Sequence, residues 1–254
     1  YSGTQLTTTI PNNAKTTIVV KSAGGTSNPL PVGPLALSSI SAVARLGTPA
    51  NAGQPSANPG QLIQINGSNL TANSNVIFPS VDDNGVAGTI PVRVSEIGAD
   101  NSWATVLVPN NATTGNITLS GATGSLALQI VPLLSGFNYS TFSAGSGVTL
   151  YGAGFVEGAG TVKFGGVNVV DPSTGSNTID VYGSGTYQNV TIPASPGPAV
   201  QVTTVGGSSN IMHMTDPNVA LLTPANAINV AVGVPVALLA YADDNSGVQY
   251  VDFL

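Results

Sequence analysis

Apolar and polar residues alternate in short runs along the chain, and turn residues separate the runs. Clear examples span residues 62–66, 104–108, 148–151 and 190–192. Alternation with a period of two puts every second side chain on the same face of a strand. Gly (31) and Pro (18) make up about a fifth of the chain, which suits turns and disfavours long helices. Strand-length runs with a turn signal roughly every ten residues predict an all-β protein of β-sandwiches.

Parts of this pattern repeat along the chain, which predicts several copies of one unit. Pro-Asn-Asn-Ala occurs at 11–14 and again at 109–112, each time between strand-like runs. Gly-Gly-Thr-Ser-Asn at 24–28 matches Gly-Gly-Ser-Ser-Asn at 206–210. Equivalent positions in neighbouring copies lie about 85 to 98 residues apart, a length typical of one immunoglobulin-like sandwich.

The order of motifs inside one copy is specific. Residues 59–132 contain Gly-Ser-Asn-Leu (67–70), then Val-x-Phe (76–78), then Val-x-Val-Pro-x-x-Ala-x-x-Gly-x-Ile-Thr-Leu (106–119). Residues 144–214 carry a weaker copy. This order resembles the IPT/TIG family of immunoglobulin-like domains. The resemblance implies tandem immunoglobulin-like β-sandwich domains in an elongated array, as in the stalks and spacers of large bacterial or archaeal surface, adhesive or polysaccharide-processing proteins.

The repeats divide the chain into two complete units and two incomplete ones. Residues 222–253 also resemble the first three strands of a bacterial Ig-like repeat. The predicted units are the final strands of an incomplete unit in 1–32, complete TIG-like sandwiches in 33–132 and 133–216, and the first strands of another incomplete unit in 217–254.

Two interpretations account for the incomplete units. The chain is part of a longer repeat protein, or the last strands of one subunit pair with the first strands of the next in a filament. Tyr1 is not an initiator methionine and no basic-then-apolar leader follows it, so we expect the chain to start downstream of a further segment.

Composition removes several classes of function. Charged residues make up 6% of the chain, the net charge is −6, and the five Lys and Arg residues are scattered. Nucleic acids and anionic membrane surfaces need clustered basic residues, so neither is an expected partner. Cysteine is absent, which excludes disulfides and thiolate chemistry. No apolar run is long enough to span a membrane, and we expect a secreted or cell-surface protein.

Candidate catalytic and metal-binding residues are few. His213 is the only histidine, and Glu96 and Glu157 are the only glutamates. Because acid–base or nucleophilic catalysis needs such groups close together, we predict no enzyme. Met212 and Met214 flank His213 but point to the opposite face of a strand, which disfavours a copper site.

Two acidic segments, residues 82–85 and 243–247, each place carboxylates beside a glycine turn. Asp/Asn-Gly is common turn chemistry, and each segment supplies too few oxygens for calcium by itself. We predict turns at both and no cofactor. The alternative is a calcium site formed by Asp243, Asp244 and Asp252.

Two aromatic residues occupy the same position in the two complete units. Counted back from Pro109, Val108, Val106 and Ala104 share the inward face of a strand, which turns Trp103 outward. The same count from Pro193 in the next unit turns Tyr187 outward, 84 residues after Trp103. An exposed aromatic ring at a recurring site can stack on a sugar or on a neighbouring subunit. A shift of one residue would bury both rings, so core packing is the alternative to partner or glycan contact.

The sequence favours a structural or adhesive module of a secreted or cell-surface repeat protein. Its expected partners are other copies of itself or neighbouring repeats. One mode of assembly that fits this interpretation is a filament, sheath or surface layer formed by head-to-tail strand complementation. The alternative is a non-catalytic carbohydrate-binding or spacer module of a secreted polysaccharide-degrading enzyme, with cell-surface glycans as partners.

Overall fold

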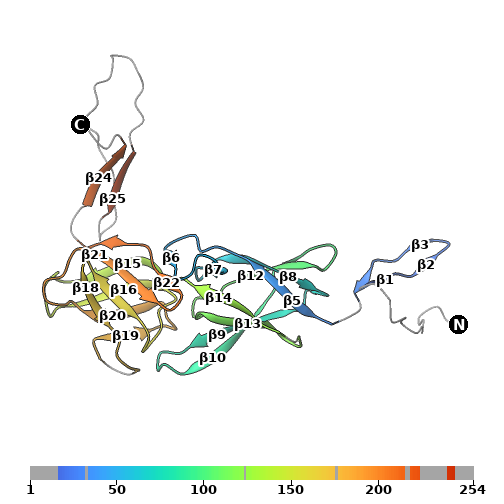
Figure 1. Cartoon of the computed structure of the whole chain (residues 1–254), viewed down its shortest axis with the longest axis horizontal. Coiled ribbons are helices and arrows are strands. Elements are labelled where there is room, and N and C mark those ends of the chain that lie inside the picture. The colour runs from blue at the N-terminus through green and yellow to red at the C-terminus, as the bar shows by residue number, and fades with distance from the viewer. Residues whose placement is uncertain are drawn as a thin grey trace, which may run out of the picture.

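The structure, a computed structural model, describes residues 17–31, 34–122, 124–174, 177–214, 218–223 and 239–243. All the regular elements in these residues are strands, which confirms the all-β prediction. Two β-sandwiches follow one another along the long axis of the molecule (Figure 1). The described residues contain no helix long and apolar enough to cross a membrane.

The first sandwich packs a four-stranded sheet, in the order β11-β12-β8-β5, against a five-stranded sheet, β10-β9-β13-β14-β7. Its inward faces bury Ile65, Phe78 and Leu128, because every second residue of each strand points to the other sheet. The strands of the first sheet are β5 (Ala36–Ser41), β8 (Leu62–Ser68), β11 (Glu96–Ile97) and β12 (Trp103–Leu107). Those of the second are β7 (Ser56–Ala57), β9 (Asn75–Val81), β10 (Ala87–Arg93), β13 (Gly115–Leu119) and β14 (Leu126–Ile130).

The second sandwich has its own core, built around Leu150, Phe164 and Ile179. One sheet has the order β15-β16-β20-β19, and the other runs β18-β17-β21-β22-β6, with β23 also paired to β21. The first sheet contains β15 (Leu133–Tyr139), β16 (Gly147–Ala153), β19 (Ile179–Tyr182) and β20 (Tyr187–Thr191). The second contains β17 (Thr161–Phe164), β18 (Val167–Val170), β21 (Ala199–Thr204), β22 (Gly207–Ser208), β23 (Met212–His213) and β6 (Thr48–Pro49).

The sequence repeat is also a repeat of backbone geometry. Gly25 has a φ of 136° and Gly207 a φ of 137°, a region in which glycine is strongly favoured. Ser27 N donates to Val20 O at 2.8 Å, and Ser209 N donates to Val202 O at 2.8 Å. The matching Gly-Gly segments therefore form the same hairpin. The copy near the N-terminus joins β2 (Lys21–Ser22) to β3 (Gly25–Thr26). Beside it, β1 (Thr17–Ile18) pairs with β4 (Leu30–Pro31).

Two further strands, β24 (Asn218–Thr223) and β25 (Leu239–Asp243), form an antiparallel pair with a register shift between Leu221 and Thr223. Similar shifts occur between Leu37 and Ser39 in β5 and between Leu134 and Gly136 in β15. Most of residues 1–32 and 217–254 lie outside the described residues. The predicted unit boundaries and the predicted strand complementation between copies therefore stay predictions.

The two sandwiches are joined by backbone pairing as well as by the covalent chain. Strand β6, which precedes most of the first sandwich in sequence, pairs with β22 at the edge of a sheet of the second. Ala50 N donates to Gly206 O at 3.1 Å, and Gly154 N donates to Asn110 O at 3.2 Å. Because backbone hydrogen bonds fix both distance and direction, the two sandwiches form a defined joint.

Replacing Gln188 with methionine is expected to stabilise the protein. The Gln188 side chain is buried in the second sandwich, and its Nε2 has no hydrogen-bond partner. An unpaired buried amide is costly, whereas methionine fills a similar volume without that cost, so we expect a gain of about 1 kcal/mol. Urea unfolding measures the change in the free energy of unfolding.

Gln129 is the matched control for this substitution. It is also buried, but its Oε1 accepts from Asn51 N at 2.7 Å and its Nε2 donates to Asn51 O at 2.8 Å. Gln129→Met should therefore destabilise the protein by about 2 kcal/mol. Equal effects of the two substitutions would show that the pairing of the amide is not what matters.

Candidate functional site

A row of tyrosines crosses the outer face of one sheet of the second sandwich. Tyr151 of β16 lies directly opposite Tyr187 of β20, which lies directly opposite Tyr182 of β19. The residues beside them in the strands, Leu150 and Val181, point inward and are buried. The strand alternation therefore forces all three rings to the outside. Tyr151, Tyr182 and Tyr187, called the tyrosine row below, keep 42%, 37% and 36% of their surface exposed.

The rings of the tyrosine row touch one another. The centroids of Tyr182 and Tyr187 are 5.4 Å apart with an interplanar angle of 21°, and those of Tyr151 and Tyr187 are 6.4 Å apart at 47°. Gly183 leaves room for the central ring, because a Cβ at that position would lie 3.0 Å from Cε1 of Tyr187. The core beneath the row is formed by residues on the other face of the same strands, such as Leu150, Val181 and Val190. The row is thus a continuous aromatic surface open to solvent.

A polar row runs parallel to the tyrosines on the same face. Asn138, Thr149, Asn189 and Asp180 lie opposite one another on four adjacent strands. Thr149 Oγ1 donates to Asn189 Oδ1 at 2.8 Å, and Asp180 Oδ1 accepts from Asn177 N at 2.9 Å. These four residues, called the polar row below, offer amide, hydroxyl and carboxylate groups beside the rings.

The charge near the tyrosine row is negative. The Asp180 carboxylate, followed by loss of hydration, raises the pKa of the Tyr182 hydroxyl above its usual value. The hydroxyl therefore stays protonated and remains a hydrogen-bond donor throughout the neutral range. The tyrosine and polar rows contain no lysine or arginine, so an anionic ligand would find no countercharge among them.

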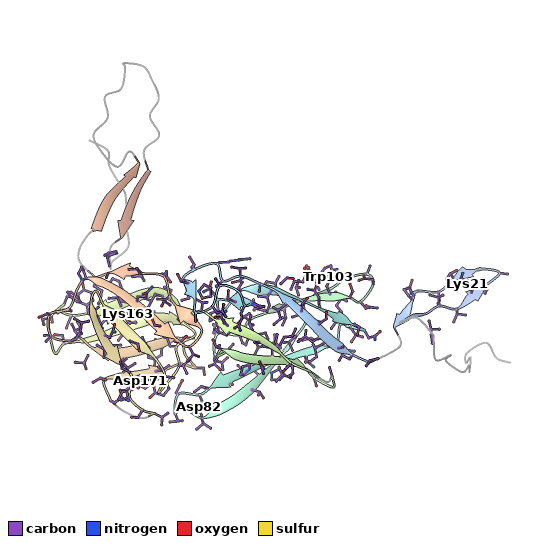
Figure 2. The ribbon with its side chains drawn as sticks, in the orientation of Figure 1. Lys21, Asp82, Trp103, Lys163 and Asp171 are labelled. Atoms are coloured by element: carbon purple, nitrogen blue, oxygen red, sulfur yellow. The ribbon has the colours of Figure 1, made fainter. Side chains whose placement is uncertain are left out.

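The turn that connects two of these strands is anchored by the first sandwich. Gly183, Ser184 and Gly185 have φ values of 62°, 56° and 79°, so their backbone N–H groups form a concave anion site. The Asp83 carboxylate fills it, accepting from Ser184 N at 2.7 Å and from Gly183 N at 3.1 Å. Figure 2 labels the neighbouring Asp82 at this boundary. Asp83 thus fixes the hairpin that carries Tyr182 and Tyr187.

The predicted turn at residues 82–85 is confirmed. Asp82 Oδ1 accepts from Asn84 N at 2.9 Å and from Val86 N at 2.8 Å. These bonds satisfy the turn internally and leave the Asp83 carboxylate to reach the second sandwich. The contact across the boundary was not apparent from the sequence, because Asp83 and Ser184 lie 101 residues apart.

Asp83→Ala should loosen the turn at Gly183 and Ser184. Without the carboxylate, the N–H groups of Gly183 and Ser184 can bond only to water. We expect this to lower the stability of the turn by about 1 kcal/mol and to speed amide exchange there about fivefold. Hydrogen exchange of the peptide containing residues 183–186 measures the effect. The control is Asp100→Ala, because Asp100 is also an exposed turn carboxylate but bonds only within the first sandwich, to Ser102. Unchanged exchange in Asp83→Ala would contradict the anchor.

The outward orientation predicted for the two recurring aromatics is confirmed. Ala104, Val106 and Val108 are fully buried, while Trp103 is half-buried on the outer face of β12. Figure 2 shows Trp103 towards the end of the first sandwich that lies away from the second. The structure therefore does not bring Trp103 and Tyr187 together. Tyr187 instead meets Tyr151 and Tyr182, which the sequence analysis missed, although their alternation with buried neighbours was visible.

The other candidate residues form no site among the described residues. Asp244 and Asp252 lie outside the described residues, as does the side chain of Asp243, so the alternative calcium site stays a prediction. Met214 is buried in the core of the second sandwich, and Met212 and His213 belong to β23. In the part of the chain that the structure describes, no group of three His, Cys, Asp or Glu side chains is placed to hold a metal.

No protein family matches the chain, and no curated protein matches it. The predicted IPT/TIG relationship therefore stays a prediction. Among solved structures, one titled as a crystal structure with xylogluco-oligosaccharide aligns with 86% of this chain and 51% of its own, at 16% identity and a TM-score of 0.29.

Two other solved structures are similar at the same low level. SGBP-B from a complex xyloglucan utilization locus in Bacteroides uniformis aligns over 71% of this chain and 49% of its own, at 16% identity and a TM-score of 0.28. A chimeric titin Z1Z2 tandem aligns over 71% and 97%, at 9% identity and a TM-score of 0.20. The chain spans about half the length of the first two structures. At such TM-scores these likenesses support no conclusion about function, which has to come from the geometry of the tyrosine row.

Proposed function

We propose that this chain is a non-catalytic glycan-binding module of a secreted or cell-surface repeat protein. The observation that carries the proposal is the tyrosine row: three solvent-exposed rings in contact at one register of three adjacent strands. Large apolar rings that face solvent instead of the core mark a contact surface. Their fixed positions on strands, rather than on a loop, suit a rigid ligand.

The chemistry of the two rows suits a neutral sugar polymer. A pyranose ring presents apolar C–H groups on its faces and hydroxyls around its edge, so it can stack on a tyrosine ring while its hydroxyls bond to the polar row. The Tyr182 hydroxyl and the Asp180 carboxylate, which share a hydrogen bond, add further polar groups beside the rings. Because no cationic group belongs to either row, neutral glycans are favoured over sulfated or uronic acid polymers.

A structural role accompanies binding in this proposal. The β6–β22 pairing and the Asp83 anchor hold the two sandwiches in one orientation, so the tandem would act as a stiff spacer that presents the tyrosine row. The low charge of the chain reduces the cost of close packing against a polysaccharide. Assembly of copies into a filament, sheath or surface layer is a separate prediction, which the tyrosine row does not address.

Affinity electrophoresis tests the proposal. The chain is run through gels that contain cellulose ethers, xyloglucan, mannan, xylan or, as anionic comparisons, pectin and heparin. We expect retardation by at least one neutral polymer and its loss in Tyr151→Ala. Val170→Ala is the matched control, because Val170 is an exposed apolar residue on the opposite sheet of the same sandwich. Migration unaffected by every neutral polymer would overturn the proposal, as would retardation that survives Tyr151→Ala unchanged.

A further inference from the structure

We infer that Trp103 forms the centre of a second glycan-binding site, on the first sandwich. This inference rests on the proposed function for its ligand class, a neutral glycan, but it concerns a different surface. The candidate site lies on the outer face of β8, β12 and β5, and its central residues are Trp103, Asn66 and Ser39.

The Trp103 surface occupies the position of the tyrosine row in the repeat. Trp103 lies opposite Asn66 of β8, and Asn66 lies opposite Ser39 of β5. In the second sandwich the same path runs from Tyr187 to Tyr151 to Gly136. In both sandwiches a register shift in the first strand immediately precedes the final residue of the path. The backbone platform is therefore shared, while one sandwich carries a cluster of tyrosines and the other a single tryptophan.

The indole ring of Trp103 rests on the backbone of Gly98. A Cβ at Gly98 would lie 2.7 Å from Cδ1 and 2.8 Å from Cε2 of the ring, and in contact with Nε1. Only glycine leaves this space, so one face of the indole is covered by main chain. Trp103 is half-buried, and it does not pack against the hydrophobic core of the first sandwich. A tryptophan supported in this way and separate from the core is placed to stack on a sugar.

Polar groups lie beside the indole. Asn66 Nδ2 donates to Ser39 Oγ at 2.9 Å and to Ser41 Oγ at 3.2 Å, and Gln64 Nε2 donates to Asn66 Oδ1 at 2.8 Å. This network holds the amide of Asn66 in one orientation next to the ring. The two serine hydroxyls are exposed and can also bond to a ligand.

The turn that joins β11 to β12, just before Trp103, carries an exposed carboxylate, that of Asp100. The Ser102 hydroxyl donates to Asp100 Oδ1 at 2.7 Å, and this bond, together with that from the Ser102 backbone, lowers the pKa of the Asp100 carboxyl. Asp100, three residues before Trp103 in the chain, is therefore a charged acceptor at neutral pH. As at the tyrosine row, the neighbouring groups favour a ligand rich in hydroxyls and without negative charge.

Trp103 is the only tryptophan in the chain, so its fluorescence reports on this surface alone. The experiment titrates the full chain with cellohexaose, mannohexaose and xylohexaose and follows the tryptophan emission. It is repeated in Tyr187→Ala, which disables the tyrosine row. We expect at least one hexasaccharide to change the emission with a saturable curve, and we expect that curve to persist in Tyr187→Ala.

Gly98→Ala tests the geometry without removing the tryptophan. The added methyl group must lift the indole from the backbone, and we expect hexasaccharide affinity at this surface to fall about tenfold. Gly88→Ala is the matched control, because Gly88 is a strand glycine of the same sandwich whose Cβ would meet only the Ser80 hydroxyl, at 3.3 Å. Circular dichroism of both variants checks that they fold.

The outcomes separate this inference from the proposed function. Suppose that no hexasaccharide changes the tryptophan emission, but a neutral polymer still retards the chain and Tyr151→Ala abolishes that retardation. This result overturns the second site and leaves the tyrosine row intact. A saturable change in tryptophan emission, combined with gel retardation that is the same in Tyr151→Ala as in the unchanged chain, supports the second site and overturns the tyrosine row. Emission curves identical in Gly98→Ala and the unchanged chain would also overturn the Trp103 site.

Discussion

Replacing Tyr187 with alanine is expected to weaken binding of the neutral polysaccharide by about 30-fold, or about 2 kcal/mol. Tyr187 is the middle ring of the tyrosine row and contacts both Tyr151 and Tyr182. Its loss removes one stacking surface and also frees its two neighbours to change rotamer. The cost should therefore exceed that of removing either outer ring. Isothermal titration calorimetry with the polymer that retards the chain measures the difference.

Val170→Ala is the control for the loss of exposed apolar surface. Val170 is 58% exposed, and it lies on the opposite sheet of the second sandwich, away from the tyrosine row. Polysaccharide affinity should remain within about twofold in that variant. Tyr187→Phe should keep most of the affinity, since it retains the ring. A Tyr187→Ala protein that binds as tightly as the unchanged chain would show that the ring does not touch the ligand.

Replacing Phe164 with alanine is expected to destabilise the second sandwich by about 3–5 kcal/mol. Phe164 is fully buried in the core of that sandwich, and Phe78 holds the equivalent place in the first. Each substitution leaves a cavity that close-packed neighbours fill only in part. Because the two cores are separate, each substitution should lower the unfolding transition of its own sandwich.

The single tryptophan distinguishes the two transitions. Trp103 belongs to the first sandwich, so its emission during urea unfolding should shift strongly in Phe78→Ala and much less in Phe164→Ala. Circular dichroism, which reports on both sandwiches, should show the loss in each variant. Equal shifts of the tryptophan transition in the two variants would mean that the β6–β22 joint makes the tandem unfold as one cooperative unit.

Local periodicity was enough to predict the strands and the direction of many side chains. The shared inward face of Ala104, Val106 and Val108 set the outward direction of Trp103, because a strand has only two faces. The matching Gly-Gly segments likewise predicted a repeated unit, and the structure shows that they form one hairpin twice, since a φ near 136° strongly favours glycine wherever that turn occurs. Such features depend on residues close together in the chain.

Features that depend on pairing between distant segments were not visible in the sequence. Tyr151 and Tyr182 each alternate with buried residues, but only the register of β16, β20 and β19 brings their rings to Tyr187. The partner of Asp83 was equally hidden, because the left-handed turn at Gly183–Gly185 lies in the other sandwich. Strand β6 is too short to be recognised from its two residues and exists through its pairing with β22.

The sequence by itself determined the all-β class, the repeat and the outward aromatics, because these follow from side-chain alternation and from residues that alone tolerate certain turns. Only the tertiary structure decided which outward aromatics meet, how the two sandwiches are joined and where a sugar could stack. Those properties depend on strand register and on contacts between segments about 100 residues apart, such as Asp83 and Ser184. Many registers would satisfy the same alternation, and the packing of the whole core selects one of them.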